Sequence, residues 1–190
     1  MQLAGPGVTI RPLEGADAAA CDEVVRSLPY HFGNADGRRE CAEAVRASAG
    51  LVAVRDDQVV GFLTVVHHFE AVSEITWMAV HARHRGQGIG QALVRRLTGQ
   101  LRDEGRRLLL VLTVSSLEEE PGVADGYQRT RAFYRSVGFL PARELPDLWP
   151  GNKALLLAMP LDGPPGRGGL RGEDARGGVR TVRSPASPSR

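Results

Sequence analysis

Three glycines fall within five positions of the sequence, at Gly86, Gly88 and Gly90, and a segment with helical apolar spacing follows them. Glycine costs about 0.5–1 kcal/mol in a helix interior relative to alanine, so a cluster at a helix start indicates a demand for bare backbone. That demand is either a turn with positive φ or the close approach of a ligand to free main-chain N–H groups. The loop therefore predicts an anion site, to which Arg85 adds positive charge, or a plain strand-to-helix turn.

Two common phosphate-binding patterns do not fit this loop. A Walker loop needs a lysine directly after its last glycine, and the chain has only Lys153, far downstream. The dinucleotide fingerprint G-x-G-x-x-G would need glycine at position 91, where Gln91 stands. The pattern that remains is R-x-x-G-x-G, which begins at Arg85.

The rest of the chain mixes strand and helix patterns, which favours an α/β or α+β sheet covered by helices. Strands are expected at 8–11, at 51–68 as a hairpin that turns at Asp56-Asp57, and at 73–80, 106–115, 139–146 and 152–161. Helices are expected at 18–28, capped by Asp17, and at 38–48, 88–103 and 127–137, the last ending at Gly138. We expect the last two strands to form an antiparallel pair.

The segment 163–190 is rich in Gly, Pro, Arg and Ser and has almost no large apolar residues. We therefore expect one domain over residues 1–162 and a disordered tail after it. The tail has six arginines against Glu173 and Asp174, so the net charge of +2 comes from the tail and leaves the domain at about −2. This distribution argues against a nucleic-acid-binding domain, and a partner- or RNA-binding tail stays open as an alternative.

Membrane and metal partners are not expected. No apolar run approaches the roughly 20 residues of a membrane-spanning helix, and the N-terminus lacks a secretory-leader pattern, so we expect a cytoplasmic protein. Cys21 and Cys41 have no metal-ligand spacing and no Cys/His cluster beside them, so we expect two buried thiols, with a disulfide as the alternative. Monomer and homodimer both stay open.

The R-x-x-G-x-G loop between a strand and a helix resembles the pyrophosphate-binding loop of the GNAT superfamily, the acetyl-CoA-dependent N-acetyltransferases. The order of patterns over residues 8–160 is similar to that family's order. The resemblance implies a GNAT fold: a mixed central sheet of six or seven strands with a splayed acetyl-CoA cleft, flanked by about four helices. It also implies acetyl-CoA contacts at Met78, Ala79 and Val80 of the strand, and at Arg85, Gly86, Gln87, Gly88, Ile89 and Gly90 of the loop.

Acetyl transfer to an amine needs an acid for the leaving thiolate and a base for the ammonium. The stretch "FYRSVGF" is similar to a family pattern whose tyrosine protonates the thiolate, so the resemblance assigns the acid to Tyr134. Glu74 has the spacing to the loop of the catalytic glutamate in histone-type members, which makes it the candidate base. A water relay, His67 or His68, and the acidic loop at 118–125 are the alternatives.

These features predict an acetyltransferase that acetylates a primary amine of a small molecule by direct attack in a ternary complex. A protein or peptide lysine or N-terminal acetyltransferase, and a CoA-binding regulatory module without turnover, are the alternatives. Tyr127 stands where the family often has an asparagine, so Tyr127 or Thr130 is expected to line the site. The helices at 18–28 and 38–48 supply much of the family's acceptor pocket but carry no motif, so the amine is not identified.

Overall fold

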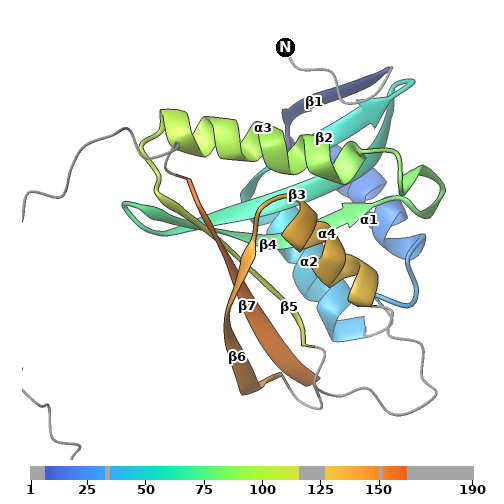
Figure 1. Ribbon diagram of the computed structural model, residues 1–190. Coiled ribbons are helices and arrows are strands. Elements are labelled where there is room, and N and C mark those ends of the chain that lie inside the picture. The colour runs from blue at the N-terminus through green and yellow to red at the C-terminus, as the bar shows by residue number, and fades with distance from the viewer. Residues whose placement is uncertain (1–6, 33–34, 116–126, 150–151, 162–190) are drawn as a thin grey trace, which may run out of the picture.

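The computed structural model describes residues 7–32, 35–115, 127–149 and 152–161. In this part of the chain, four α-helices cover the two faces of a seven-stranded sheet with the order β1-β2-β3-β4-β5-β7-β6 (Figure 1). The strands are β1 (Val8–Pro12), β2 (Ala49–Arg55), β3 (Gln58–Phe69), β4 (Val72–Val80), β5 (Leu108–Val114), β6 (Leu140–Trp149) and β7 (Asn152–Pro160). The helices are α1 (Ala18–Arg26), α2 (Ala35–Ala47), α3 (Ile89–Asp103) and α4 (Gln128–Ser136). The expected mixed sheet with about four helices is confirmed.

The sheet opens between its only parallel pair of strands in the described residues. The ladder between β4 and β5 joins Val72–Ile75 to Leu108–Val111 and extends no further along β4. Beyond the bulged Thr76, the remainder of β4, Trp77–Val80, still pairs with β3 on its other edge. The main-chain groups of this segment that would bond to β5 therefore face a gap between the two strands.

A β-bulge at Thr76 changes the face on which β4 presents its side chains. Thr64 of β3 pairs with Trp77 and the next residue, Val65, pairs with Ile75, so Thr76 has no partner in the ladder. Ile75 consequently lies in the apolar core under α3 and α4, whereas Trp77 packs against the core under α1 and α2. The Trp77 N–H donates to the Thr64 hydroxyl at 3.1 Å, which satisfies the main chain beside the bulge.

Each face of the sheet has its own apolar core. The core under α3 and α4 contains the predicted apolar face of α3 at Ile89, Leu93 and Leu97. The core under α1 and α2 contains Cys21 and Cys41, which are buried free thiols as expected. Burial raises the pKa of each thiol to about 12, so neither is a reactive thiolate at neutral pH.

The predicted turns form where residues tolerate positive φ. Asp56 and Asp57, with φ of 49° and 61°, make the two-residue connection between β2 and β3. Gly138, with φ of 105°, follows α4 and ends it.

None of the described helices has the length and apolar content needed to cross a bilayer. The expected acidic loop and tail lie outside the described residues.

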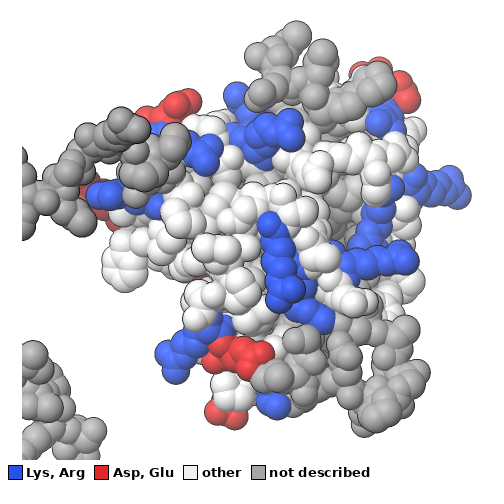
Figure 2. Space-filling model, viewed as in Figure 1, with Lys and Arg blue, Asp and Glu red and all other residues white. Residues whose placement is uncertain are grey.

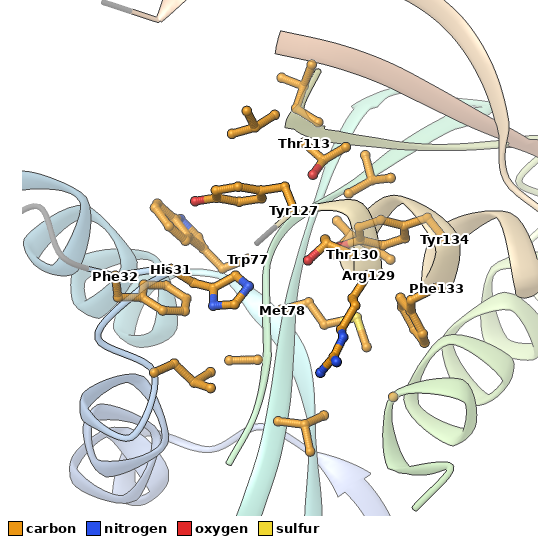
Figure 3. A pocket seen from close by; sticks show the side chains of 18 of the residues that line it. His31, Phe32, Trp77, Met78, Thr113, Tyr127, Arg129, Thr130, Phe133 and Tyr134 are labelled. Atoms are coloured by element: carbon orange, nitrogen blue, oxygen red, sulfur yellow. The ribbon is translucent and has the colours of Figure 1, made fainter. Parts of the chain in front are cut away.

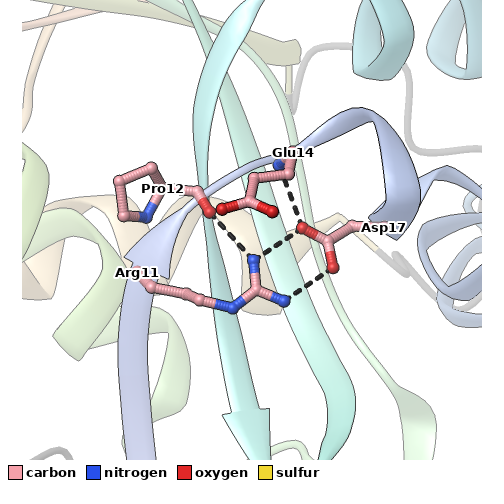
Figure 4. A network of polar contacts seen from close by, with 4 residues as sticks. All are labelled: Arg11, Pro12, Glu14 and Asp17. Carbon is pink, nitrogen blue, oxygen red and sulfur yellow. Dashed lines mark hydrogen bonds and ion pairs between the residues drawn. The ribbon is translucent and has the colours of Figure 1, made fainter.

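Asp17 stands at the start of α1, but its side chain does not cap that helix as the sequence predicts. Its two carboxylate oxygens instead accept hydrogen bonds from the two terminal nitrogens of Arg11, each at 2.7 Å (Figure 4). Oδ2 also accepts the Glu14 N–H at 3.0 Å. These bonds, led by the one from Arg11, hold the pKa of Asp17 below its usual value. The pair ties the end of β1 to the start of α1.

We expect Asp17→Asn to lower the free energy of unfolding at pH 7 by about 1–2 kcal/mol, since Arg11 is partly exposed and solvent screens the pair. Because the pKa of Asp17 is lowered on folding, its stabilisation is present above its unfolded pKa of about 4 and is lost as the pH falls from there through the lower folded pKa. Urea unfolding at pH 7 and pH 3 should therefore show a variant deficit that shrinks in acid. Glu23→Gln, in an exposed pair with Arg26, is the control and should cost little at either pH.

Candidate active site

A cavity of about 820 Å³ lies where β4 and β5 separate. It is lined from both faces of the sheet, by Phe32 and Trp77 on the side of α1 and α2 and by Phe133 and Tyr134 of α4 on the other (Figure 3). Its volume is that of a small-molecule site. The opening in the sheet thus connects two differently built walls through one cavity.

The three glycines of the loop are needed for two different physical reasons. Gly86 and Gly88 have φ of 74° and 78°, a left-handed backbone that glycine adopts without strain. Gly90 has no positive φ, but a Cβ there would approach the Phe133 ring to 3.1 Å and the Met78 methyl group to 3.2 Å. The first two glycines therefore shape the loop, and the third lets α3 pack closely against α4 and β4.

The loop presents a helix start with unpaired main-chain N–H groups to the cavity. The first main-chain bond of α3 runs from the Ala92 N–H to the Gly88 carbonyl at 3.0 Å, so the N–H groups of Ile89, Gly90 and Gln91 have no partner within the helix. These groups lie at the positive end of the helix dipole. Arg85 lines the cavity and forms no ion pair within the described residues. Figure 2 shows Lys and Arg side chains gathered over this end of α3.

Gln87 has a different place from the other residues of the loop. Its side-chain oxygen accepts a hydrogen bond from Arg55 Nη1 of β2 at 2.6 Å, and its side-chain nitrogen donates to the Arg83 carbonyl at 3.1 Å. Gln87 does not line the cavity, whereas Arg85, Gly86, Gly88, Ile89 and Gly90 do. Its side chain therefore holds the loop against β2.

The predicted strand residues line the cavity along the opened edge of β4. Met78 and Val80 turn their side chains into the core under α3 and α4, and Ala79 is buried on the opposite face. Met78 and Val80 stand opposite Leu63 and Gly61 of β3. The His81 N–H donates to the Val60 carbonyl at 2.9 Å, so in the alternating ladder Ala79 bonds to β3 and the main-chain groups of Met78 and Val80 point to the opened edge. An extended ligand arm can therefore reach only the edge of β4 that faces β5.

Tyr134 of α4 combines burial with an available hydroxyl group. Its ring packs edge-on against Phe133 and Phe139, with centroids 5.2 and 5.4 Å away, and the residue lines the cavity. The hydroxyl has no hydrogen-bond partner within the described residues. Burial raises the pKa of Tyr134 above its ordinary value, so the phenol stays protonated at neutral pH and can donate.

Glu74 lines the same cavity near the start of the opened segment. Its Oε2 lies 2.5 Å from Nε2 of His68, and the Glu74 side chain is 17% exposed. His67 faces elsewhere and bonds the Ser73 hydroxyl at 2.9 Å, as adjacent residues on a strand should. The carboxylate is therefore held in place by one histidine and is open to the cavity.

The sequence predicts some of the other residues that line the cavity and misses the rest. Tyr127 and Thr130 line the cavity at the positions predicted from the missing asparagine. The rest of the lining adds aromatic and acidic residues that no motif marks. They are Phe32, Asp36, Glu40, Trp77 and Trp149. No cluster of three or more metal-ligating side chains occurs among the described residues.

The model of the acetyltransferase (GNAT) domain family matches residues 46–141, which include β4, the loop, α3 and α4. No curated protein sequence matches the chain. Among solved structures, the ribosomal-protein-S18-alanine N-acetyltransferase of Escherichia coli aligns at 19% identity and TM-score 0.66, covering 85% of this chain and 97% of its own. An aminoglycoside 6'-N-acetyltransferase complexed with coenzyme A aligns at 16% identity and TM-score 0.64, covering 83% and 99%.

A GNAT family acetyltransferase from Elizabethkingia anophelis with acetyl-CoA bound aligns at 15% identity and TM-score 0.63, covering 82% of this chain and 99% of that one. At these identities the likeness shows the fold. By name, one of these enzymes acetylates a ribosomal protein and another acetylates an aminoglycoside, so the shared fold leaves the acceptor of this chain open.

Proposed function

The chain belongs to the GNAT family of acetyltransferases, and we propose that it transfers the acetyl group of acetyl-CoA to a primary amine of a small molecule. The observation that carries the proposal is the single cavity at the opening of β4 and β5. It joins an anion-binding helix start to a buried phenol, Tyr134, and to a carboxylate, Glu74. Those are the groups that a direct transfer between two bound substrates requires.

In this proposal each part of the site holds or moves a defined group. The N–H groups at the start of α3 and Arg85 bind the pyrophosphate of CoA, and the free edge of Thr76–Val80 binds its extended arm. A main-chain N–H on that edge polarises the thioester carbonyl. The amine nitrogen attacks the carbonyl carbon, the C–N bond forms and the C–S bond breaks. Tyr134 gives its proton to the departing sulfur and recovers one from solvent.

The nitrogen loses two protons, one from the ammonium before attack and one after the C–N bond forms, and in this proposal both pass in turn through Glu74. An alkylammonium has a pKa of about 10, so a primary amine must lose a proton before it attacks. Glu74 faces the cavity, and its contact with His68, which is 38% exposed, offers a way to pass the proton to solvent. His68 acts here as a positioning residue, because it touches Glu74 and does not line the cavity.

We expect Glu74→Gln to lower kcat by about a hundredfold, because the amide keeps the shape of the side chain but cannot take a proton. Steady-state kinetics measure kcat, and calorimetry should show unchanged CoA affinity. Glu43→Gln is the matched control: it removes a carboxylate of α2 that is exposed and does not line the cavity. A wild-type kcat in Glu74→Gln would show that water or another residue acts as the base.

The test of the function itself combines CoA binding with thiol release. Calorimetry should show saturable binding of CoA, and acetyl-CoA should release free thiol only when an amine is added. The panel contains small primary amines and a lysine peptide, so that turnover with the peptide alone would replace a small-molecule acceptor with a protein one. CoA binding without any turnover would support a regulatory module, and an absence of CoA binding would overturn the proposal.

A further inference from the structure

The aromatic residues of this chain gather at the cavity. The sequence contains five Phe, three Tyr and two Trp. Six of these ten residues line the cavity, including both tryptophans, although the chain is only 5% aromatic. They are Phe32, Trp77, Tyr127, Phe133, Tyr134 and Trp149. Large aromatic side chains usually pack in the core, so their concentration at the cavity points to a ligand with an apolar or aromatic surface.

The rings divide into two groups with different tasks. Phe133 and Tyr134 belong to α4, and Phe133 packs against Gly90 at the start of α3. On the other side, Phe32 and Trp77 lie with centroids 6.0 Å apart and planes 31° from parallel. Figure 3 shows Phe32, His31, Trp77 and Tyr127 together, across the cavity from Phe133. The second group lies away from the loop assigned to CoA, where the acceptor would enter.

These rings are available for contact from the cavity. Phe32 and Trp77 pack only partly against the core under α1 and α2, and Trp77 owes its place on that face to the bulge at Thr76. Tyr127 reaches the same end of the cavity from the start of α4, where its ring lies 5.3 Å from the ring of His31. Half-buried ring faces that line a cavity are suited to contact with a planar ring.

The charges on the lining are separated in the same way. Arg85 and Arg129 line the cavity together with the loop and the start of α4. Asp36, which pairs with Arg39 at 2.9 Å, and Glu40 line it from α2 on the side of Phe32, and Glu74 adds a third carboxylate on β4. A cation therefore meets favourable potential on the aromatic side, and an anion meets it on the glycine-loop side.

We infer that the acceptor is an arylalkylamine: a primary amine on a short chain from a planar aromatic ring. The ring lies against Trp77 and Phe32 beside Tyr127, and the amine points toward Glu74. An aliphatic polyamine or an aminoglycoside would leave these ring faces against polar groups. This inference rests on the proposed acetyl transfer, whose chemistry is unchanged, and it adds the class of the amine.

The test compares amines that differ in one property each. The full-length protein is assayed for thiol release with 2-phenylethylamine, 2-cyclohexylethylamine, spermidine and a lysine peptide. We expect kcat/KM for 2-phenylethylamine to exceed that for spermidine and for the peptide by at least about tenfold, and that for the saturated ring by about fivefold. Trp77→Leu and, separately, Phe32→Leu should remove most of this preference. Phe69→Leu, an aromatic residue that is 77% exposed outside the cavity, is the control and should keep it.

Calorimetric CoA binding distinguishes a failure of this inference from a failure of the proposed function. Normal CoA binding with equal or better turnover of spermidine or the peptide would overturn the arylalkylamine assignment and leave acetyl transfer standing. Where CoA binds and no amine turns over, titration of 2-phenylethylamine into the CoA complex decides: an absence of saturable binding overturns the assignment. Retained preference in both Trp77→Leu and Phe32→Leu also overturns it, and CoA binding by each variant shows that it is folded.

Discussion

Replacing Tyr134 with phenylalanine should lower kcat by about a hundredfold or more while the affinity for CoA stays the same. The substitution removes one hydroxyl group and keeps the ring that packs against Phe133 and Phe139. Because that hydroxyl has no partner within the described residues, its loss should not lower the thermal midpoint. The expected result is therefore a catalytic defect in a protein that is as stable as the parent.

The pH dependence gives this prediction a second readout. An acid must be protonated to act, and burial raises the pKa of Tyr134 above its ordinary value of about 10. Deprotonation of Tyr134 should therefore cause no fall in rate between pH 7 and about pH 10 in the wild-type enzyme. Steady-state kinetics across this range measure it. A Tyr134→Phe enzyme with wild-type kcat would show that water protonates the thiolate.

The fold was predictable because its signals are local. Asp56-Asp57 and Gly138 stand where the chain adopts positive φ, and such residues mark turns without reference to the rest of the structure. The apolar spacing from Ile89 onward likewise predicts which face of α3 is buried. The glycine loop is also a local feature, since its glycines and the helix start are contiguous in the sequence.

The face presented by β4 was not predictable from alternation. In the stretch "EITWMAV", strict alternation places Ile75, Trp77 and Ala79 on one face of the sheet. The bulge at Thr76 separates them, so Ile75 enters one core and the other two enter the opposite one. A single extra residue in one strand moves every later side chain of that strand to the opposite face of the sheet. The residue type at position 76 does not indicate such a bulge.

The aromatic wall of the cavity was not predictable for a different reason. Phe32, Trp77 and Trp149 come from separate segments, and only the folded chain brings them to one cavity. In the sequence, each of these residues looks like an ordinary apolar residue of the core, and α1 and α2 carry no motif. Chemistry that depends on contiguous main chain can be predicted from a sequence, whereas a pocket assembled from distant side chains requires the structure.

Replacing Gly88 with leucine should abolish measurable CoA binding, a loss of at least about a hundredfold in affinity, in a protein that remains folded. Gly88 lines the cavity at the start of α3, and a Cβ there would meet only Oε1 of Gln91, at 4.0 Å. The new side chain therefore finds room in the protein itself and projects beside the N–H groups that would hold the pyrophosphate. Calorimetry with CoA is the measurement.

The difficulty with this variant is that leucine at a φ of 78° also strains the backbone, by about 1–2 kcal/mol. Gly105→Leu separates the two effects, because Gly105 has a φ of 77°, lies past the other end of α3, and would place a Cβ with no other atom within 4 Å. Both variants should lose similar stability in urea, and only Gly88→Leu should lose CoA. Unchanged affinity at Gly88→Leu would mean that the glycines serve the turn alone, and equal losses in both variants would trace the defect to the strain on α3.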